Sequence, residues 1–224
     1  MYFDPMYFLF VGPAILLSLW ASFKTKSAFN KYSKVATRSG LTGAQAAQRL
    51  LDTAGITDVE IVPTRGTLSD HYNPVTKKLA LSEPVYASNS VAAVGVACHE
   101  AGHAIQHAKA YKPLWLRSTL VPTASIGSRF SMIAIIAGIF LGMQGLITIG
   151  IVLFSAVVLF QLLTLPVEFD ASARAKKLAP AMGILSTPAE QQGVDKVLNA
   201  AALTYVAAAL TSIMQLLYFL SRRE

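Results

Sequence analysis

The sequence predicts a mainly α-helical integral membrane protein with about four transmembrane helices. Of its 224 residues, 54% are hydrophobic and 14% are charged, which is unlike a typical soluble domain. Four stretches have the roughly 20 largely uncharged residues that a membrane span needs. A further alanine-rich helix pattern carries three of the four histidines. This helix lies outside the spans and predicts a small α+β domain.

Three apolar segments supply the four predicted spans. The first span runs from about Pro5 to Phe23, and it is an uncleaved anchor because it lacks a basic start and an evident cleavage site. The block Phe130–Pro166 has 37 residues, enough for two spans with a turn at residues 142–145. The fourth span runs from about Leu198 to Leu220. The block contains no ionisable residue, which argues against a transporter.

Positive charge predicts the orientation of these spans. Of 19 Lys and Arg residues, 12 lie from Lys24 to Arg117 and 4 from Arg174 to Lys196. The positive-inside rule places both stretches in the cytoplasm and both termini outside, although Arg222 and Arg223 fit that topology poorly. The net charge of +7 therefore reflects membrane topology, and we expect no nucleic-acid partner.

Short elements are predicted between the first span and the histidine-rich helix. They are a helix from Thr42 to Ala54 that stops at Gly55 and a strand from Val59 to Val62 that ends at Pro63. Residues 68–72 and 77–81 then form a hairpin or a pair of extended segments about an Asn73-Pro74 turn. Ser88 or Ser90 can cap the following helix, Val91–Ala108. This order predicts a small α+β arrangement.

The helix Val91–Ala108 contains the sequence His99-Glu100-Ala101-Gly102-His103. Residues four apart share a helix face, so both imidazoles can bind one metal ion, with Glu100 beside them. In zinc peptidases with this pattern, zinc activates water and the glutamate accepts its proton as general base. The alternative is a buried helix whose histidines are only hydrogen-bonded.

A third metal ligand must come from another segment. His107 lies about 12 Å along the helix axis from His99, so we expect it to support the site or to lie on the helix face. Glu168 follows the third span at its cytoplasmic end and is the preferred ligand, with Asp170 as the fallback. Pro166, just before it, suits a kink or a fresh helix start. An acid at a helix start could instead stabilise the helix dipole.

Three further features bear on the chemistry. His71 is a candidate transition-state stabiliser, although a lone loop histidine is more often a surface residue. The strand at residues 77–81 precedes the motif helix, and an exposed edge there can hold an extended peptide. Cys98 is the single cysteine, which excludes an internal disulfide, and we interpret it as a small buried residue rather than a ligand.

With these residues in view, the chain resembles the YugP-type neutral zinc metallopeptidases, a family of bacterial membrane proteins. The resemblance covers nearly the whole length and rests on residues 69–74, Leu81-Ser82, residues 99–106 and residues 168–172. It implies a membrane-bound zinc protease.

There is a looser likeness to the HtpX and CAAX-prenyl proteases. In those families, a Glu-x-x-x-Asp pattern supplies the third ligand and an acid that orients a zinc histidine. Glu168 matches the ligand position, whereas Ser172 stands at the position of the second acid. Ser172, Asp170 or a backbone carbonyl could therefore orient the zinc histidine.

These observations predict a zinc metalloprotease in the cell membrane, multi-pass, with its active site facing the cytoplasm. His99, His103 and Glu168 hold Zn²⁺, Glu100 is the general base, and His71 assists. The partners are a protein or peptide substrate and the lipid bilayer. The alternative is a non-catalytic membrane scaffold stabilised by zinc, which would not need Glu100.

The expected organisation has five parts. They are an N-terminal transmembrane helix (1–23), a cytoplasmic zinc-peptidase region (24–117), a transmembrane hairpin (118–166), a cytoplasmic segment with the third ligand (167–197), and a C-terminal transmembrane helix with its tail (198–224).

Overall fold

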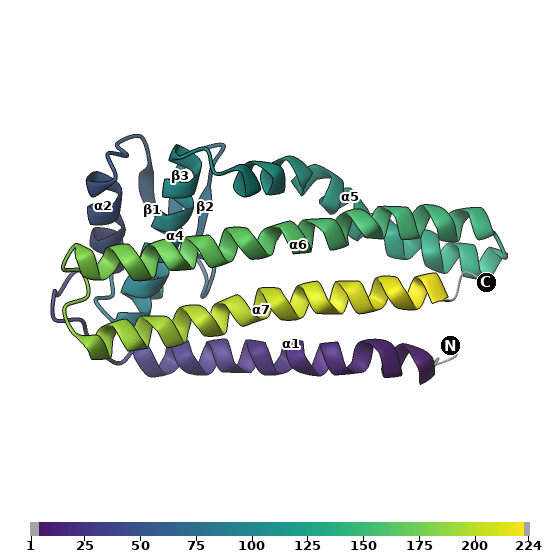
Figure 1. The fold of residues 1–224 in the computed structure, drawn as a ribbon, viewed down its shortest axis with the longest axis horizontal. Helices are drawn as coiled ribbons and strands as arrows, with labels where there is room; N and C mark the ends of the chain where they lie inside the picture. The colour runs from purple at the N-terminus through teal and green to yellow at the C-terminus, as the bar shows by residue number, and fades with distance from the viewer. Residues whose placement is uncertain (1–4, 222–224) are drawn as a thin grey trace. The chain divides into compact units, whose positions relative to one another are not determined.

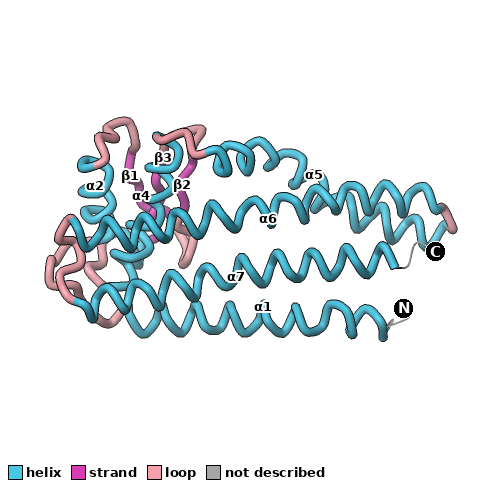
Figure 2. Tube along the Cα trace, viewed as in Figure 1, coloured by secondary structure: helices cyan, strands magenta, loops and turns pink. Residues whose placement is uncertain are grey.

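A computed structural model describes residues 5–221, most of which are helical (Figure 1). The helices are α1 (Pro5–Tyr32), α2 (Gly43–Thr53), α3 (Glu83–Tyr86), α4 (Val91–Ala108), α5 (Lys112–Leu141), α6 (Gln144–Ala181) and α7 (Pro188–Ser221). The strands are β1 (Glu60–Thr64), β2 (His71–Asn73) and β3 (Lys78–Ser82), which form one small sheet (Figure 2). The prediction of a mainly helical protein is confirmed.

Helices α1, α5, α6 and α7 are each long and apolar enough to cross a membrane. This agrees with the predicted number of spans, but all four helices extend beyond the predicted stretches, α1 as far as Tyr32. α5 begins at Lys112, well before Phe130, and α7 begins at Pro188 rather than near Leu198. The prediction for Arg222 and Arg223 lies outside the described residues.

Helix α6 continues through Pro166, which corrects the expectation of a fresh helix start there. A proline removes one backbone hydrogen bond from the ladder, whereas α6 has 38 residues whose other bonds and packing maintain it. Glu168 therefore lies inside a continuous helix. The alternative that it stabilises a helix N-terminus is wrong.

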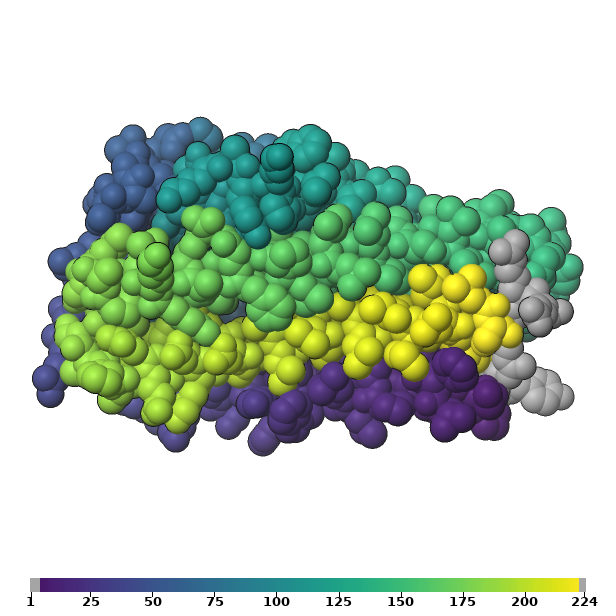
Figure 3. All heavy atoms as spheres, in the orientation of Figure 1, coloured from purple at the N-terminus to yellow at the C-terminus, as the bar shows by residue number. Residues whose placement is uncertain are grey.

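The chain forms two compact units. The helical unit contains Lys112–Pro166 together with the ends of the chain up to Ser22 and from Leu203. Within it, α5, α6 and α7 share a small core that includes Phe154 and Phe219, whose ring centroids are 5.8 Å apart, and Figure 3 shows side chains of α6 and α7 in adjoining rows.

Many large apolar side chains of the helical unit face outward. Leu16 is 68% exposed, Phe140 85% and Val152 65%. Exposed apolar surface of this extent is typical of an interaction surface or a membrane-facing surface. It fits the four apolar helices.

The sheet unit contains Phe23–Tyr111 and Val167–Ala202, with the three strands beside α2 and α4 (Figure 1). The strand order is β1-β3-β2, with β1 parallel and β2 antiparallel to β3. The predicted hairpin is thus confirmed. The expectation of an exposed edge at residues 77–81 is wrong, because β3 is paired on both sides.

The predicted strand Val59–Val62 is shifted toward the C-terminus. β1 runs through Pro63 to Thr64 rather than ending before the proline. A proline has no N–H to donate, but β1 is an edge strand with one neighbour, where a missing donor is tolerated.

Helix α2 closes one side of the core of the sheet unit. Thr42 and Gln45 form a reciprocal capping box at its start, and Gly55, with a φ of +71°, ends it in a left-handed conformation that suits glycine. Apolar side chains from α2, α4, β3, α6 and α7 then pack together; they include Leu50, Leu51, Leu79, Val94, Ala101, Ala175 and Val194. This packing fixes the helix that carries the histidines.

Candidate metal centre

Helix α4 presents His99 and His103 on one face, with ring centroids 4.7 Å apart. Ser90 caps the helix by accepting a hydrogen bond from the Ala93 N–H, as the sequence predicted. At Gly102 the helix meets α6 very closely, since a Cβ there would lie 2.7 Å from the Ala171 carbonyl oxygen. The absence of a side chain at Gly102 therefore allows α6 to approach the two histidines.

Glu168 of α6 reaches both histidines. Its Oε2 is 3.2 Å from His99 Nε2 and 3.6 Å from His103 Nε2. One ligand atom from each of the three residues lies within 4.8 Å of the other two. Two imidazoles and one carboxylate thus converge in the manner of a metal centre, and Asp170 is not a member of this group.

The donor set fits a zinc ion. Each imidazole directs Nε2 toward Glu168, while its Nδ1 meets a protein group: Ser172 Oγ is 3.1 Å from His99 Nδ1 and Gln106 Oε1 is 3.0 Å from His103 Nδ1. Metal-binding histidines commonly use one ring nitrogen for the metal and the other for such a hydrogen bond. Two histidine nitrogens and a glutamate oxygen form a known ligand set of catalytic zinc.

The local charges favour a bound cation. Burial disfavours a charged His103, but the close approach of Glu168 and the negative charges of Glu100 and Glu168 outweigh burial and raise the pKa of His103 above its usual value. The same field that stabilises a proton on this imidazole would stabilise a metal ion beside it. Glu168 is only 2% exposed, so its carboxylate is directed into the protein.

Glu100 is also buried, with 8% exposure. Within residues 5–221 no side-chain oxygen that is shielded from solvent lacks a hydrogen-bond partner, and no hydrogen bond to the Glu100 carboxylate is seen there, so its oxygens reach solvent. A solvent-accessible carboxylate beside a metal centre can exchange protons with water or substrate.

Gln106 is the residue that sequence reasoning missed. It is fully buried and contacts His103 from one turn further along α4. The available signal was a polar residue three positions after the second histidine in an otherwise apolar helix. Of the three groups expected to orient a zinc histidine, Ser172 contacts His99, and Asp170 contacts Gln106 rather than an imidazole.

The other two histidines lie apart from this group of ligands. His71 is exposed on β2, and its Nδ1 is 2.9 Å from the Ser69 carbonyl oxygen; its proposed catalytic role stays a prediction. His107 Nδ1 is 2.8 Å from the Tyr72 hydroxyl.

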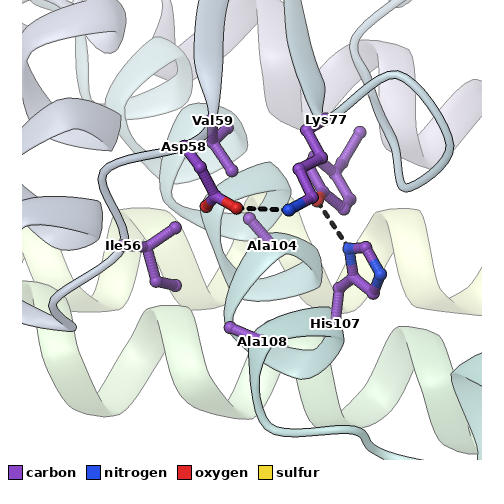
Figure 4. A pocket seen from close by; sticks show the side chains of 8 residues that line it. Ile56, Asp58, Val59, Lys77, Ala104, His107 and Ala108 are labelled. Atoms are coloured by element: carbon purple, nitrogen blue, oxygen red, sulfur yellow. Dashed lines mark hydrogen bonds and ion pairs between the residues drawn. The ribbon is translucent and has the colours of Figure 1, made fainter.

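His107 also lines a pocket of about 170 Å³ between α4 and the strands (Figure 4). Asp58 and Lys77 form an ion pair in its wall, and Ile56, Val59 and Ala104 provide its apolar lining. The pocket is therefore of mixed character, with charged and apolar walls.

Residues 7–224 match a family described as "Putative neutral zinc metallopeptidase". The chain is 52% identical over 215 residues to "Putative membrane protease YugP" of Bacillus subtilis (strain 168), covering 96% of this chain and 95% of that one. No solved structure matches it. With its helical architecture and its cluster of two histidines and a glutamate, the chain belongs to the neutral zinc metallopeptidase family of that membrane protein.

Proposed function

We propose that this protein is a membrane metalloprotease in which His99, His103 and Glu168 hold a zinc ion. The observation that carries the proposal is the convergence of these three side chains, with both Nε2 atoms directed toward one carboxylate oxygen. Zinc bound there supplies Lewis acidity, which polarises a peptide carbonyl and lowers the pKa of water.

Glu100 is the general base in this proposal. Its carboxylate accepts a proton from the attacking water and then delivers that proton to the amine that leaves. Its position beside the two histidines, where its negative charge acts on His103, and the solvent access of its oxygens support this role. A scaffold stabilised by zinc would have no use for such a group.

The substrate is a membrane-proximal protein or a peptide, bound in an extended form. β2 is an edge strand that pairs with β3 alone, so its other edge can accept a substrate strand. β2 also contacts the motif helix through the Tyr72–His107 hydrogen bond. His71 lies on the same strand, where it can reach a bound peptide and assist at the transition state.

The protein crosses the cell membrane several times, and its active site faces the cytoplasm. The two basic stretches, residues 24–117 and 167–197, are the cytoplasmic parts, since lysine and arginine are retained on that side. The transmembrane helices lie within residues 5–23, 118–166 and 198–220.

The test combines zinc content with hydrolysis of labelled casein by the detergent-purified full chain. We expect about one zinc ion per wild-type chain. Glu100→Gln should retain the zinc but lose hydrolysis by about 100-fold or more, because a general base contributes that much. Glu168→Ala should lose the zinc. Glu83→Gln, at an exposed glutamate of α3, is the matched control and should behave as wild type.

Two results would contradict the proposal in different ways. Equal hydrolysis by wild type and Glu100→Gln would remove Glu100 from the mechanism. A zinc-loaded wild type that cleaves neither casein nor any member of a random peptide library would favour the scaffold.

A further inference from the structure

Gln106 is a fully buried polar side chain whose amide is hydrogen-bonded at both ends. Its Oε1 is 3.0 Å from His103 Nδ1. Its Nε2 donates to the Val167 carbonyl oxygen at 2.8 Å and to Asp170 Oδ2 at 2.8 Å. The side chain thus links the motif helix α4 to the segment of α6 that carries Glu168.

These partners permit only one orientation of the amide. The carbonyl of Val167 and the carboxylate of Asp170 can accept hydrogen bonds but cannot donate them in this state. Turning the amide over would place its oxygen against both acceptors and its NH₂ group against the imidazole. The oxygen of Gln106 must therefore face His103.

The guanidinium of Arg174 fixes Asp170, the last residue in this series of hydrogen bonds. Arg174 donates from Nε to Asp170 Oδ2 at 2.5 Å and from a terminal nitrogen to Asp170 Oδ1 at 3.3 Å. Its guanidinium lies 5.8 Å from the centre of the Tyr111 ring. Since a guanidinium can only donate, Asp170 remains the acceptor between Arg174 and Gln106.

We infer that Gln106 is a positioning residue that keeps a proton on Nδ1 of His103 and leaves the lone pair of Nε2 for the metal. An amide oxygen can only accept, so the ring nitrogen facing it must carry hydrogen. In neutral imidazole, the other nitrogen is then the free one. This inference rests on the proposed zinc centre and gives Asp170 a role through Gln106 instead of on the metal.

The two metal histidines differ in this respect. His99 Nδ1 meets the hydroxyl of Ser172, and a hydroxyl can donate or accept. Ser172 therefore holds the ring of His99 without choosing which nitrogen carries the proton. Of the two, only His103 has its Nδ1 facing a group that can do nothing but accept.

The first test measures zinc affinity of the full chain in detergent by competition with a chromophoric chelator. Gln106→Met keeps the length of the side chain but has no amide, and we expect it to bind zinc about 10- to 100-fold more weakly, the usual effect of losing such a partner. Gln48→Met, at an exposed glutamine of α2 that bonds only Asp52, is the matched control and should bind as wild type.

A second pair of variants tests the hydrogen bond between Gln106 and Asp170 by exchanging which of the two positions carries the amide and which the carboxylate. Gln106→Glu alone places two carboxylates in contact and should weaken binding at least as much as Gln106→Met. In the double variant Gln106→Glu/Asp170→Asn, the new amide can donate to the new carboxylate and accept from Arg174. The two carboxylates then no longer face each other, while His103 keeps an acceptor. We expect the double variant to recover part of the affinity that the single change loses, since the Val167 carbonyl still lacks its donor.

The imidazole itself provides a readout that packing alone would not change. The chain has four histidines, so ¹⁵N-histidine labelling gives four ring systems, with His103 assigned from a His103→Gln variant. In zinc-loaded wild type we expect a proton on Nδ1 of His103 and the metal on Nε2. In Gln106→Met the Nδ1 proton should exchange faster with solvent.

The possible results distinguish the role of Gln106 from the zinc centre on which it depends. A wild type that binds no zinc would overturn the metal centre and this inference together. Zinc binding with the metal on Nδ1 of His103, or zinc affinity of Gln106→Met within twofold of wild type, would overturn the role of Gln106 alone.

Discussion

Cys98 and Tyr72 retain their protons to unusually high pH in the folded protein. Burial raises the pKa of the Cys98 thiol from its usual 9.0 to about 12. Burial, with a smaller contribution from the negative charge of Asp58, raises the pKa of Tyr72 from 10.0 to about 12. In both groups the folded state holds a proton that the unfolded chain releases first.

These shifts predict a loss of stability at alkaline pH. Because the folded pKa lies above the unfolded one, the stabilisation is complete below pH 9 and declines as pH rises toward 12. Cys98 alone should lower the free energy of unfolding by about 1.4 kcal/mol per pH unit in that window. Thermal unfolding in detergent across pH 8–11 measures the decline.

The control for this prediction is Cys98→Ala. Its decline should begin about one pH unit later, near the usual pKa of tyrosine, and Tyr72→Phe should reduce what remains. An unchanged onset in Cys98→Ala would show that Cys98 does not hold a shifted proton.

At the scale of single residues, the ligand candidates follow from spacing, and the family likeness pointed to Ser172 beside His99, whereas nothing local pointed to Gln106. His99 and His103 are four apart on a helix, and Glu168 is an acid just after a span, so local pattern is enough to propose them. Gln106 has a partner 61 residues away at Val167 and another at Asp170. Contacts of this kind depend on how α4 packs against α6, which no local pattern encodes.

At the scale of elements, the contact between α4 and α6 at Gly102 determines where Glu168 lies. A Cβ there would meet the Ala171 backbone, with its carbonyl oxygen at 2.7 Å and its Cα at 3.2 Å. Neither atom can move without moving α6. We therefore expect Gly102→Ala to cost about 1–3 kcal/mol of stability by overpacking and to weaken zinc binding by displacing Glu168.

Gly145→Ala is the matched comparison, since a Cβ at this helical glycine meets nothing within 4 Å. It should be neutral or slightly stabilising, because alanine favours a helix and Gly145 lies in the first turn of α6, where the preference is weaker than in the interior. Thermal unfolding and zinc titration of both variants provide the measurement. Equal behaviour of the two would mean that α6 tolerates a side chain at position 102.

The helices and strands could be predicted where their boundaries are set by neighbouring residues in the sequence. Thr42 and Gly55 bound α2, and the Asn73-Pro74 turn joins β2 to β3, because capping and turn chemistry act over a few residues. Two features required the tertiary structure. β1 passes through Pro63 because it is an edge strand, and the pairing of β3 on both sides depends on the parallel partner β1.

At the scale of the whole molecule, the proposed topology can be tested by cysteine labelling, because the single native thiol is buried. Met143→Cys, between α5 and α6, should react with an impermeant maleimide on intact cells. Thr76→Cys, in the exposed turn after β2, should react only after the cells are permeabilised. The positive-inside distribution of lysine and arginine is the reason for both expectations.

Wild type serves as the background in this experiment and should remain unlabelled until it is denatured. Labelling of Thr76→Cys from outside, with Met143→Cys protected, would reverse the proposed orientation. The number of apolar helices could be predicted because hydropathy is additive along a segment. Their orientation is set during membrane insertion by the distribution of lysine and arginine, so it needs a measurement in the membrane.

The burial of the ligand set has a consequence for the lifetime of a bound ion. With Glu168 2% and His103 7% exposed, a chelator could approach a bound ion only from the side left open for substrate, and it could not displace the protein ligands while α4 and α6 remain in contact. Complete departure would then wait for a rare local opening, because a chelator on the open side would still share the ion with three protein ligands. Such a centre, once filled, would keep its zinc through periods when the cell has little to supply.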